Sequence, residues 1–419
     1  MRWLGRRSHR DAEELFRNYV LDADSFWSGK MLRQAEKLQR QVDALTDQLG
    51  CGPEGVAEAI LAVARRRRPA PPGVYVTGLG SSGSHWLAGM LGELPGFVDV
   101  GEVYFSAELR DRLSAFDRED QQFVADAIQL LHGLPGTEIE VESTVNSAAG
   151  AYELELYKTW DPRAVVVYLF RDPRDQVLSA TFRKDEYRTY QAPSADDREY
   201  LLRMCARNRA DHDRYRALDQ RADHEVAYED LRDDPIPHLT QIAALAGADV
   251  SETALSEVAF RHDAANIRAG RVADKGNLDL GGESQGWRQD ADRGLRELLH
   301  VELAEVIDAL GYPLTECLAV ADDVGDPVRI GADDAAPGGR VLCAAGSDRV
   351  DDGCVRSILT GQPRVLDLSR TAVTEAIVDD LAAAEGLAAV GLVGTDISPE
   401  RVARLERQRP DLDVLTTIP

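Results

Sequence analysis

The sequence predicts an α/β protein: a doubly wound parallel sheet that follows a helical N-terminal extension and precedes a small repeat-like α/β C-terminal region. From Val74 onward, short apolar runs alternate with amphipathic segments, which is the pattern of strand–helix–strand units. The run 164–170 (AVVVYLF) is apolar on both faces, as a strand inside a parallel sheet must be. A turn rich in glycine and serine follows the first strand. We expect three parts, residues 1–72, 73–318 and 319–419.

Composition excludes several classes of function. The 419 residues are 44% hydrophobic and 29% charged, as in a folded chain with more than one core. A net charge of −25 repels phosphate backbones, so we expect no nucleic-acid partner. The five cysteines are scattered without metal-ligand spacing, which predicts no metal site and a reducing, cytoplasmic location. No apolar run reaches the roughly 18 residues of a membrane span. The basic start, residues 1–7, is interpreted as a solvated end, with weak contact to a membrane surface as the alternative.

The N-terminal part is predicted to be helical, because apolar residues recur at helical spacing through residues 11–68. This stretch ends at four arginines, 65–68, which we interpret as a solvated helix end, and a proline and glycine linker follows at 69–73. In the central part we expect strands at 74–77, 164–170 and 224–228, and helices at 84–94, 173–184, 196–221, 235–247 and 291–310.

The C-terminal part contains an internal repeat. The segment 365–374 (VLDLSRTAVT) recurs as 389–398 (AVGLVGTDIS), an offset of 24 residues, and a fainter copy begins at residue 341. A repeat of this length with a Leu-x-Leu core resembles leucine-rich repeats. So few repeats barely form a core, so we expect them to dock on the preceding domain. The alternative is an ordinary small α/β appendage.

A phosphate-binding loop is predicted at residues 78–86 (GLGSSGSHW), between the first strand and the next helix. Backbone N–H groups and a helix N-terminus there would point at one anion. Gly83 lets the backbone approach closely, and the Ser84 hydroxyl adds a hydrogen bond. The spacing from Gly78 to Gly83 matches an ATP-binding P-loop, but Ser84 stands where that loop has lysine. A P-loop kinase of small molecules is therefore the disfavoured reading.

A second phosphate contact is predicted after the strand 164–170. Arg171 ends this strand, Pro173 suits the first turn of the next helix, and Ser179 follows eight residues after the arginine. An arginine and a serine placed in this way can converge on one phosphate.

Together these motifs resemble the sulfotransferase family over residues 74–313. The family's 5′-phosphosulfate loop (PKSGTTWL) corresponds to residues 80–87 (GSSGSHWL), and its 3′-phosphate motif (RDPRD, then Ser) to residues 171–179. Residues 228–231 (YEDL) and 286–288 (GWR) resemble two further family segments.

The resemblance implies that the co-substrate is 3′-phosphoadenosine 5′-phosphosulfate and that no metal is needed. It assigns Gly83, Ser84 and His85 to the 5′ side of the nucleotide and Arg171 and Ser179 to the 3′-phosphate. Trp86 either stacks near the adenine or anchors its helix, and we favour anchoring. The remaining candidates for contact with the nucleotide are Ser81, Ser82, Tyr228, Trp287 and Arg288, with Arg268, Arg271 and Lys275 as further cations.

Two positions depart from the family. Ser81 occupies the place of a lysine or arginine that stabilises charge in the transition state. In residues 142–144 (EST), Ser143 replaces the lysine of a Glu-Lys-Thr segment. Lys158 is set aside because it lies too close to Arg171 in the sequence.

A general base is needed to accept the proton of an acceptor hydroxyl. Glu102 is the first choice, because Gly101-Glu102 resembles a segment that carries a catalytic glutamate in some branches of the family. His85 is second and Glu142 third.

We therefore expect a sulfotransferase that acts on a hydroxyl or amine of a small molecule, lipid or glycan. The alternative is a nucleotide-binding or scaffold protein of the same fold without turnover, as Ser81 and Ser143 would suggest.

Overall fold

The computed structural model describes residues 8–27, 32–103, 105–133, 144–147, 153–182, 197–219, 221–271, 293–312, 341–345 and 350–416. The chain forms two compact units that alternate along the sequence. The first comprises Met1–Arg171 and Asp211–Gly281, and the second Asp172–Ala210 and Gly282–Pro419.

The first unit is built on a parallel sheet. Its strands are β1 (Val74–Gly78), β2 (Val145–Ser147), β3 (Val165–Phe170) and β4 (His224–Ala227), in the order β2-β1-β3-β4. The three predicted strands are confirmed, and so is the α/β fold class. The edge strand β2 was not predicted, because three residues are too few to show a period.

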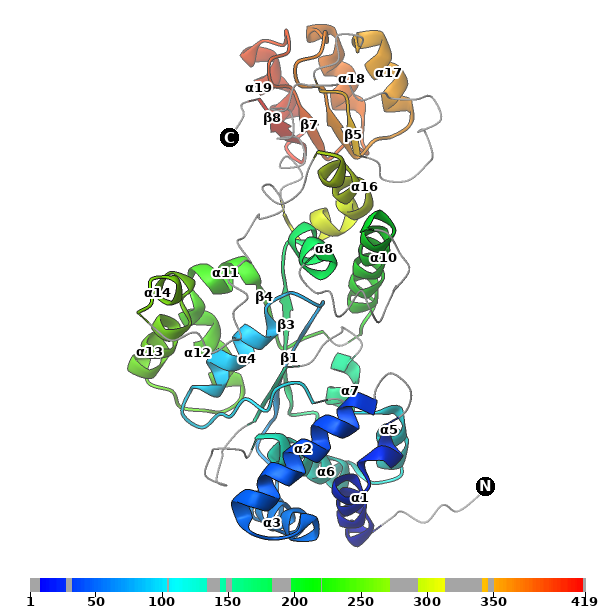
Figure 1. The fold of residues 1–419 in the computed structure, drawn as a ribbon. Helices are drawn as coiled ribbons and strands as arrows, with labels where there is room; N and C mark the ends of the chain where they lie inside the picture. The colour runs from blue at the N-terminus through cyan, green and yellow to red at the C-terminus, as the bar shows by residue number, and fades with distance from the viewer. Residues whose placement is uncertain are drawn as a thin grey trace. The chain divides into compact units, whose positions relative to one another are not determined.

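Each face of this sheet packs against its own set of helices. Val76, Val167 and Leu169 share a buried cluster with α4 (Ser84–Gly92), α12 (Pro235–Leu245) and α13 (Glu252–His262). Tyr75, Val166 and Tyr168 point to the opposite face. Figure 1 shows α4, α12 and α13 together beside β1, β3 and β4. The strands are therefore buried on both faces, which explains their continuous apolar sequence.

The N-terminal helices share the core of the opposite face rather than forming a separate one. They are α1 (His9–Leu21), the 3₁₀ helix η1 (Ala23–Phe26), α2 (Leu32–Leu49) and α3 (Pro53–Arg66), and they are joined by α5 (Ala107–Leu113), α6 (Arg118–Gly133) and α7 (Glu153–Trp160). A capping box of Ser8 and Asp11 starts α1.

The interpretation of residues 65–68 as a solvated helix end is wrong at Arg67. Its side chain is only 10% exposed and its Nη2 lies 3.2 Å from the Asp126 carboxylate. Arg65 is half-exposed and pairs with Glu13 at 2.7 Å. Burial of one member of the run follows from the packing of α3 against α6, which a charge count cannot reveal.

Two further helices in the described part of the first unit are α11 (Tyr228–Asp233), which follows β4 directly, and α14 (Ala264–Arg268). α10 (Asp197–Arg216) runs through the boundary between the two units at residues 210 and 211. Within the described ranges, no helix is long and apolar enough to cross a membrane.

The second unit contains a sheet with a regular register. Its parallel strands are β5 (Val341–Cys343), β6 (Val365–Asp367), β7 (Ala389–Gly391) and β8 (Asp413–Leu415), in that order. Val365 pairs with Val341 and with Ala389, and Ala389 pairs with Asp413, so each step is 24 residues. The spacing seen in the sequence is thus the spacing between neighbouring strands, and β8 continues the series by one step.

Both faces of this second sheet are covered. Val365 and Ala389 pack with the apolar side chains of α8 (Pro173–Phe182), α10 and α16 (Arg293–Ala309). Leu366 and Val390 pack on the other face with α17 (Asp352–Thr360), α18 (Val378–Ala383) and α19 (Pro399–Gln408). The 3₁₀ helix η6 (Glu375–Ile377) leads into α18. The repeats therefore rest on helices that precede them in the chain.

Candidate functional site

The loop after β1 has a backbone that glycine makes possible. A Cβ on Gly78 would lie 2.2 Å from the carbonyl oxygen of Leu169, so only glycine fits where β1 passes β3. The chain then turns through left-handed conformations at Ser81 (φ 70°) and Gly83 (φ 97°) before α4 begins at Ser84. Such turns at the N-terminus of a helix make a concave array of N–H groups that suits an anion.

Two hydroxyl groups of this loop are left for a ligand. The Oγ atoms of Ser81 and Ser82 are buried and have no hydrogen-bond partner among the described residues. Leaving a buried hydroxyl unpaired costs about 1 to 3 kcal/mol. Phosphate oxygens at this place would accept both hydrogen bonds, so the loop is suited to a phosphate group. It supplies no charged side chain at position 81.

Tyr228 connects this loop with Arg171. A Cβ on Gly83 would lie 2.8 Å from Cδ2 of Tyr228, so the ring packs directly on the glycine. The Cζ atom of Arg171 lies 4.6 Å from the centroid of the same ring, within the range of a cation–π contact. The structure therefore brings three of the predicted site residues together.

These residues lie where sheet topology favours a binding site. The loop, Arg171 and Tyr228 each follow the carboxyl end of a strand, namely β1, β3 and β4, which are neighbours in the sheet. The chain passes from β1 to β2 on one side and returns to β3 on the other, so the strand order reverses between β1 and β3. Ligands of open α/β sheets bind outside the carboxyl ends at such a reversal.

Trp86 holds α4 to α13. Its side chain is buried, and its indole N–H donates a hydrogen bond to the carbonyl oxygen of His262 at 3.2 Å. Glu93, directly after α4, pairs with Arg261 at 2.7 Å and with His262 at 3.0 Å. These contacts support the anchoring role.

The first two choices for a general base form one pair. Nε2 of His85 lies 3.1 Å from Oε1 of Glu102, and the histidine side chain is 53% exposed. Glu102 follows Gly101, which has a φ of +65° and whose N–H donates to Oδ1 of Asp99 at 2.8 Å. A histidine and a carboxylate within hydrogen-bond reach can together accept a proton.

Sequence reasoning missed one residue of this region, Lys37 on α2. Its Nζ donates a hydrogen bond to the carbonyl oxygen of Glu102 at 2.9 Å. Its position on a helix outside the sheet gave no motif to find. The available signal was the rarity of lysine, because the chain contains only five among its 48 basic residues.

The remaining predicted residues are not among the contacts described above. Ser179 is on α8, in the second unit. Arg268 ends α14, and Nε of Arg271 donates to Asn266 within the same segment at 2.8 Å. Trp287, Arg288, Lys275, Glu142 and Ser143 lie outside the described residues.

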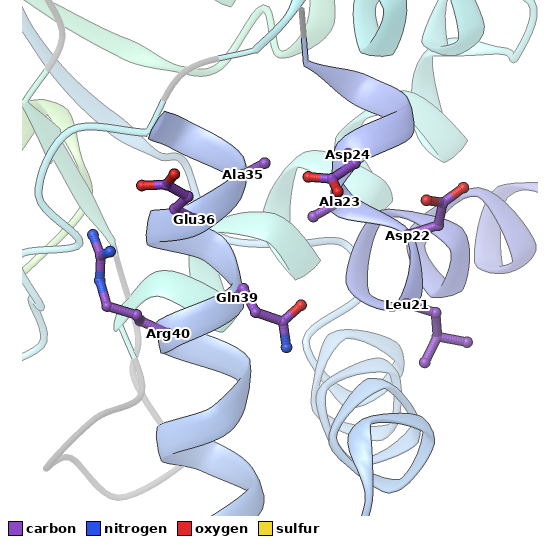
Figure 2. Close-up of a pocket in the computed structure, with 8 residues that line it drawn as sticks. All are labelled: Leu21, Asp22, Ala23, Asp24, Ala35, Glu36, Gln39 and Arg40. Carbon is purple, nitrogen blue, oxygen red and sulfur yellow. The ribbon is translucent and has the colours of Figure 1, made fainter. Parts of the chain in front are cut away.

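A cavity of 430 Å³ lies between η1 and α2. Figure 2 shows Ala35 and Gln39 of α2 on the side that faces η1, with Glu36 and Arg40 on another side of the helix. The lining residues are Leu21, Asp22, Ala23, Asp24, Ala35, Glu36, Gln39 and Arg40. In the described parts of the chain, no cluster of three or more histidine, cysteine or acidic residues could hold a metal ion.

Comparison with known structures finds sulfotransferases. The mouse sulfotransferase SULT7A1, solved with PAP, is 12% identical, with a TM-score of 0.39 over 56% of this chain and 84% of its own. Sulfotransferase STF9 from Mycobacterium avium is 13% identical, with a TM-score of 0.37 over 73% of this chain and 97% of its own. A sulfotransferase from Alicyclobacillus acidocaldarius is 15% identical, with a TM-score of 0.33 over 59% of this chain and 99% of its own.

No curated protein matches the sequence. One family model does match: the model of the sulfotransferase family covers residues 149–252. This stretch contains Arg171, Ser179 and Tyr228, but not the loop after β1. The match to the sulfotransferase family therefore covers about a quarter of the chain.

Proposed function

We propose that this protein is a sulfotransferase that moves a sulfuryl group from 3′-phosphoadenosine 5′-phosphosulfate to a hydroxyl or amine of a small molecule, lipid or glycan. One observation carries the proposal: Tyr228 packs on Gly83 of the loop and also under the Arg171 guanidinium. An anion-binding loop and an arginine are thereby held at one edge of the sheet, as a nucleotide with phosphates at both ends requires.

The nucleotide would be held from both ends. The loop backbone and the hydroxyls of Ser81, Ser82 and Ser84 would bind the 5′ side, and Arg171 with Ser179 the 3′-phosphate. Trp287 and Arg288 are proposed to close over it. When bound, the phosphosulfate supplies an activated sulfuryl group.

The proton of the acceptor would pass to the His85–Glu102 pair. As the acceptor oxygen or nitrogen bonds to sulfur, the bond from sulfur to the bridging oxygen breaks and the charge remains on the leaving phosphate. Backbone N–H groups and the N-terminus of α4 would stabilise this charge. The exposed histidine can meet an acceptor, and the carboxylate beside it can orient the ring or take the proton itself.

Glu102→Gln and His85→Gln separate these roles. If His85 is the base and Glu102 orients it, Glu102→Gln should keep some transfer activity and His85→Gln should lose all of it. If Glu102→Gln loses all activity and His85→Gln keeps some, Glu102 is the base. Equal, full activity in both variants would exclude the pair from proton transfer.

Binding and transfer should be measured separately. In the first assay, desulfated nucleotide (PAP) should raise the melting temperature, since a ligand at 100 times its Kd stabilises by about 2.7 kcal/mol, while ATP with Mg²⁺ should not. In the second, labelled donor is incubated with a panel of acceptors. If PAP does not raise the melting temperature and no labelled product forms with any acceptor, the proposal is refuted.

A nucleotide-binding protein without turnover is the second candidate, and the uncharged Ser81 favours it. It predicts stabilisation by PAP without any labelled product. Ser81→Lys should raise transfer if the protein is an enzyme that lacks only this cation, and should change nothing if it is a scaffold. Stabilisation by ATP with Mg²⁺ instead would point to a kinase.

Three further assignments belong to this proposal. We propose boundaries near residues 72 and 318, a cytoplasmic location, and a short leucine-rich-repeat-like array at the C-terminus. The repeat assignment is supported by the register of β5 to β8, in which every step is 24 residues.

A further inference from the structure

A helix outside the nucleotide-binding sheet reaches the candidate base. α2 packs in the core with α3 and α6 and contributes no strand or loop to the binding edge. Two side chains on it, one turn apart, nevertheless donate to backbone carbonyls of the central part. Nζ of Lys37 binds the Glu102 carbonyl at 2.9 Å, and Nε2 of Gln41 binds that of Leu131 at 2.9 Å.

The contact from Lys37 completes a set of restraints on one short segment. The N–H of Val100 donates to the Val145 carbonyl at 2.8 Å, and the N–H of Gly101 donates to Asp99 at 2.8 Å. Lys37 then fixes the carbonyl of the next residue, Glu102. Because the backbone is held on both sides of this carboxylate, its side chain is directed toward His85.

The charge of Lys37 acts on the same group of residues. Burial lowers the pKa of Lys37, and the negative charges of Glu102 and Asp99 oppose that effect, while Arg40 on the same helix adds to it. Burial raises the pKa of Asp99, which Lys37 counteracts.

From α6, His132 faces the same lysine, and burial together with the Lys37 charge lowers its pKa to about 3. Among the described residues, His85 from α4 and Lys37 from α2 contact Glu102, and Asp99 lies in the same loop. Arg40 from α2 and His132 from α6 interact with Lys37 through its charge.

We propose that Lys37 is a positioning residue for the proposed sulfuryl transfer: it fixes the backbone at Glu102 and supplies the positive charge that keeps the His85–Glu102 pair ready to accept a proton. This inference rests on the proposed function for its catalytic part only. It also assigns the N-terminal helices a role in the reaction, which the family resemblance does not.

Lys158 provides a matched control. It too is a lysine whose Nζ binds a backbone carbonyl, that of Ala164 at 2.5 Å, and it pairs with Asp223 at 2.5 Å. Ala164 precedes β3, whereas Arg171 follows it, so the control lies about 20 Å from the binding edge. Lys37→Met and Lys158→Met thus remove the same charge and the same kind of hydrogen bond at the two ends of the sheet.

Three readouts test the inference. In Lys37→Met, hydrogen exchange at the amides of Val100 and Gly101 should become at least about fivefold faster, since the segment loses a restraint. The affinity for PAP should stay within about twofold, because Lys37 does not touch the loop. The acidic limb of the pH–rate profile should move to higher pH by about half a unit or more, because the Glu102 carboxylate loses a neighbouring cation.

Lys158→Met should show none of these effects, and Lys37→Arg, which keeps the charge, should retain the wild-type acidic limb. If Lys37→Met does not fold, the pH–rate profile of Lys37→Arg still tests whether the positive charge at position 37 sets the acidic limb.

Unchanged exchange at residues 100–101 in Lys37→Met, or the same change in Lys158→Met, would overturn the inference, and so would a shifted acidic limb in Lys37→Arg. Since exchange needs no turnover, this outcome is distinct from failure of the proposed function, which would appear as absent PAP binding and absent product in the wild type.

Discussion

Replacing Gly83 by alanine tests whether the positions of the loop, the Tyr228 ring and the Arg171 side chain depend on one another. The new Cβ would lie 2.8 Å from Cδ2 and 3.0 Å from Cε2 of Tyr228, distances at which the ring must move. The backbone at 83, with a φ of +97°, also lies in a region that disfavours any side chain. Because the Arg171 guanidinium rests on the same ring, moving the ring should move the arginine.

The magnitude follows from two contributions. A left-handed conformation costs a non-glycine residue about 1 to 2 kcal/mol. Overpacking against a ring costs about 1 to 3 kcal/mol. A combined loss of about 2 to 5 kcal/mol should lower the melting temperature of a unit of this size by roughly 4 to 20 °C.

Gly80→Ala is the control, because it places the same methyl group in the same loop with nothing within 4 Å and without a positive φ. Thermal unfolding and calorimetry with PAP measure the two effects, and the affinity of Gly83→Ala should fall at least about tenfold, equivalent to 1.4 kcal/mol. If Gly83→Ala and Gly80→Ala melt together and bind PAP equally, the coupling through Tyr228 does not exist.

Three further predictions concern charge and packing. Arg171→Gln should weaken binding of PAP by about 30- to 100-fold, as expected for a charge-assisted hydrogen bond, but should hardly change binding of adenosine 5′-phosphate; calorimetry with both nucleotides would show equal losses if Arg171 does not bind the 3′-phosphate. Because folding lowers the pKa of His132 from 6.5 to about 3, its contribution to stability is full above pH 6.5 and is lost as the pH falls toward 3. In urea unfolding, the free energy of unfolding of the wild type should therefore fall as the pH is lowered, and His132→Gln should make this fall smaller by about 2 to 4 kcal/mol. If the fall is the same in both proteins, the pKa of His132 is not lowered by folding. Leu366→Ala, at a buried position of β6, should lower the free energy of unfolding of the second unit by about 2 to 4 kcal/mol. Leu245→Ala, at an exposed position, should lower the free energy of unfolding by less than about 0.5 kcal/mol. Equal losses in the two variants would contradict the packing of Leu366.

Much of the first sheet could be predicted because its signals are local. Strand β3 lies between two helical layers, so its apolar sequence is continuous, and the loop after β1 carries its glycines and serines in one run. The repeat offset was equally visible, because each strand of the second sheet pairs with a neighbour 24 residues away.

The residues that sequence reasoning missed depend on contacts between distant segments. Lys37 reaches Glu102 across 65 positions of the chain, and Arg67 is buried against Asp126 across 59. Neither has a neighbour in the sequence that marks its partner. The separate roles of Tyr228 were likewise hidden, since its contacts with Gly83 and Arg171 arise only when β1, β3 and β4 lie side by side.

The alternation of the two units along the chain has a consequence for biosynthesis. When the ribosome has made residues up to Arg171, β1, β2 and β3 exist but β4 does not, so β3 is an unpaired edge of wholly apolar sequence. The 56 residues 172–227 take roughly 3 to 11 s to synthesise at roughly 5 to 20 residues per second. During that interval the nascent chain exposes a strand able to pair with other chains. We expect yield in a cell to depend on chaperones and on the speed of translation through this stretch.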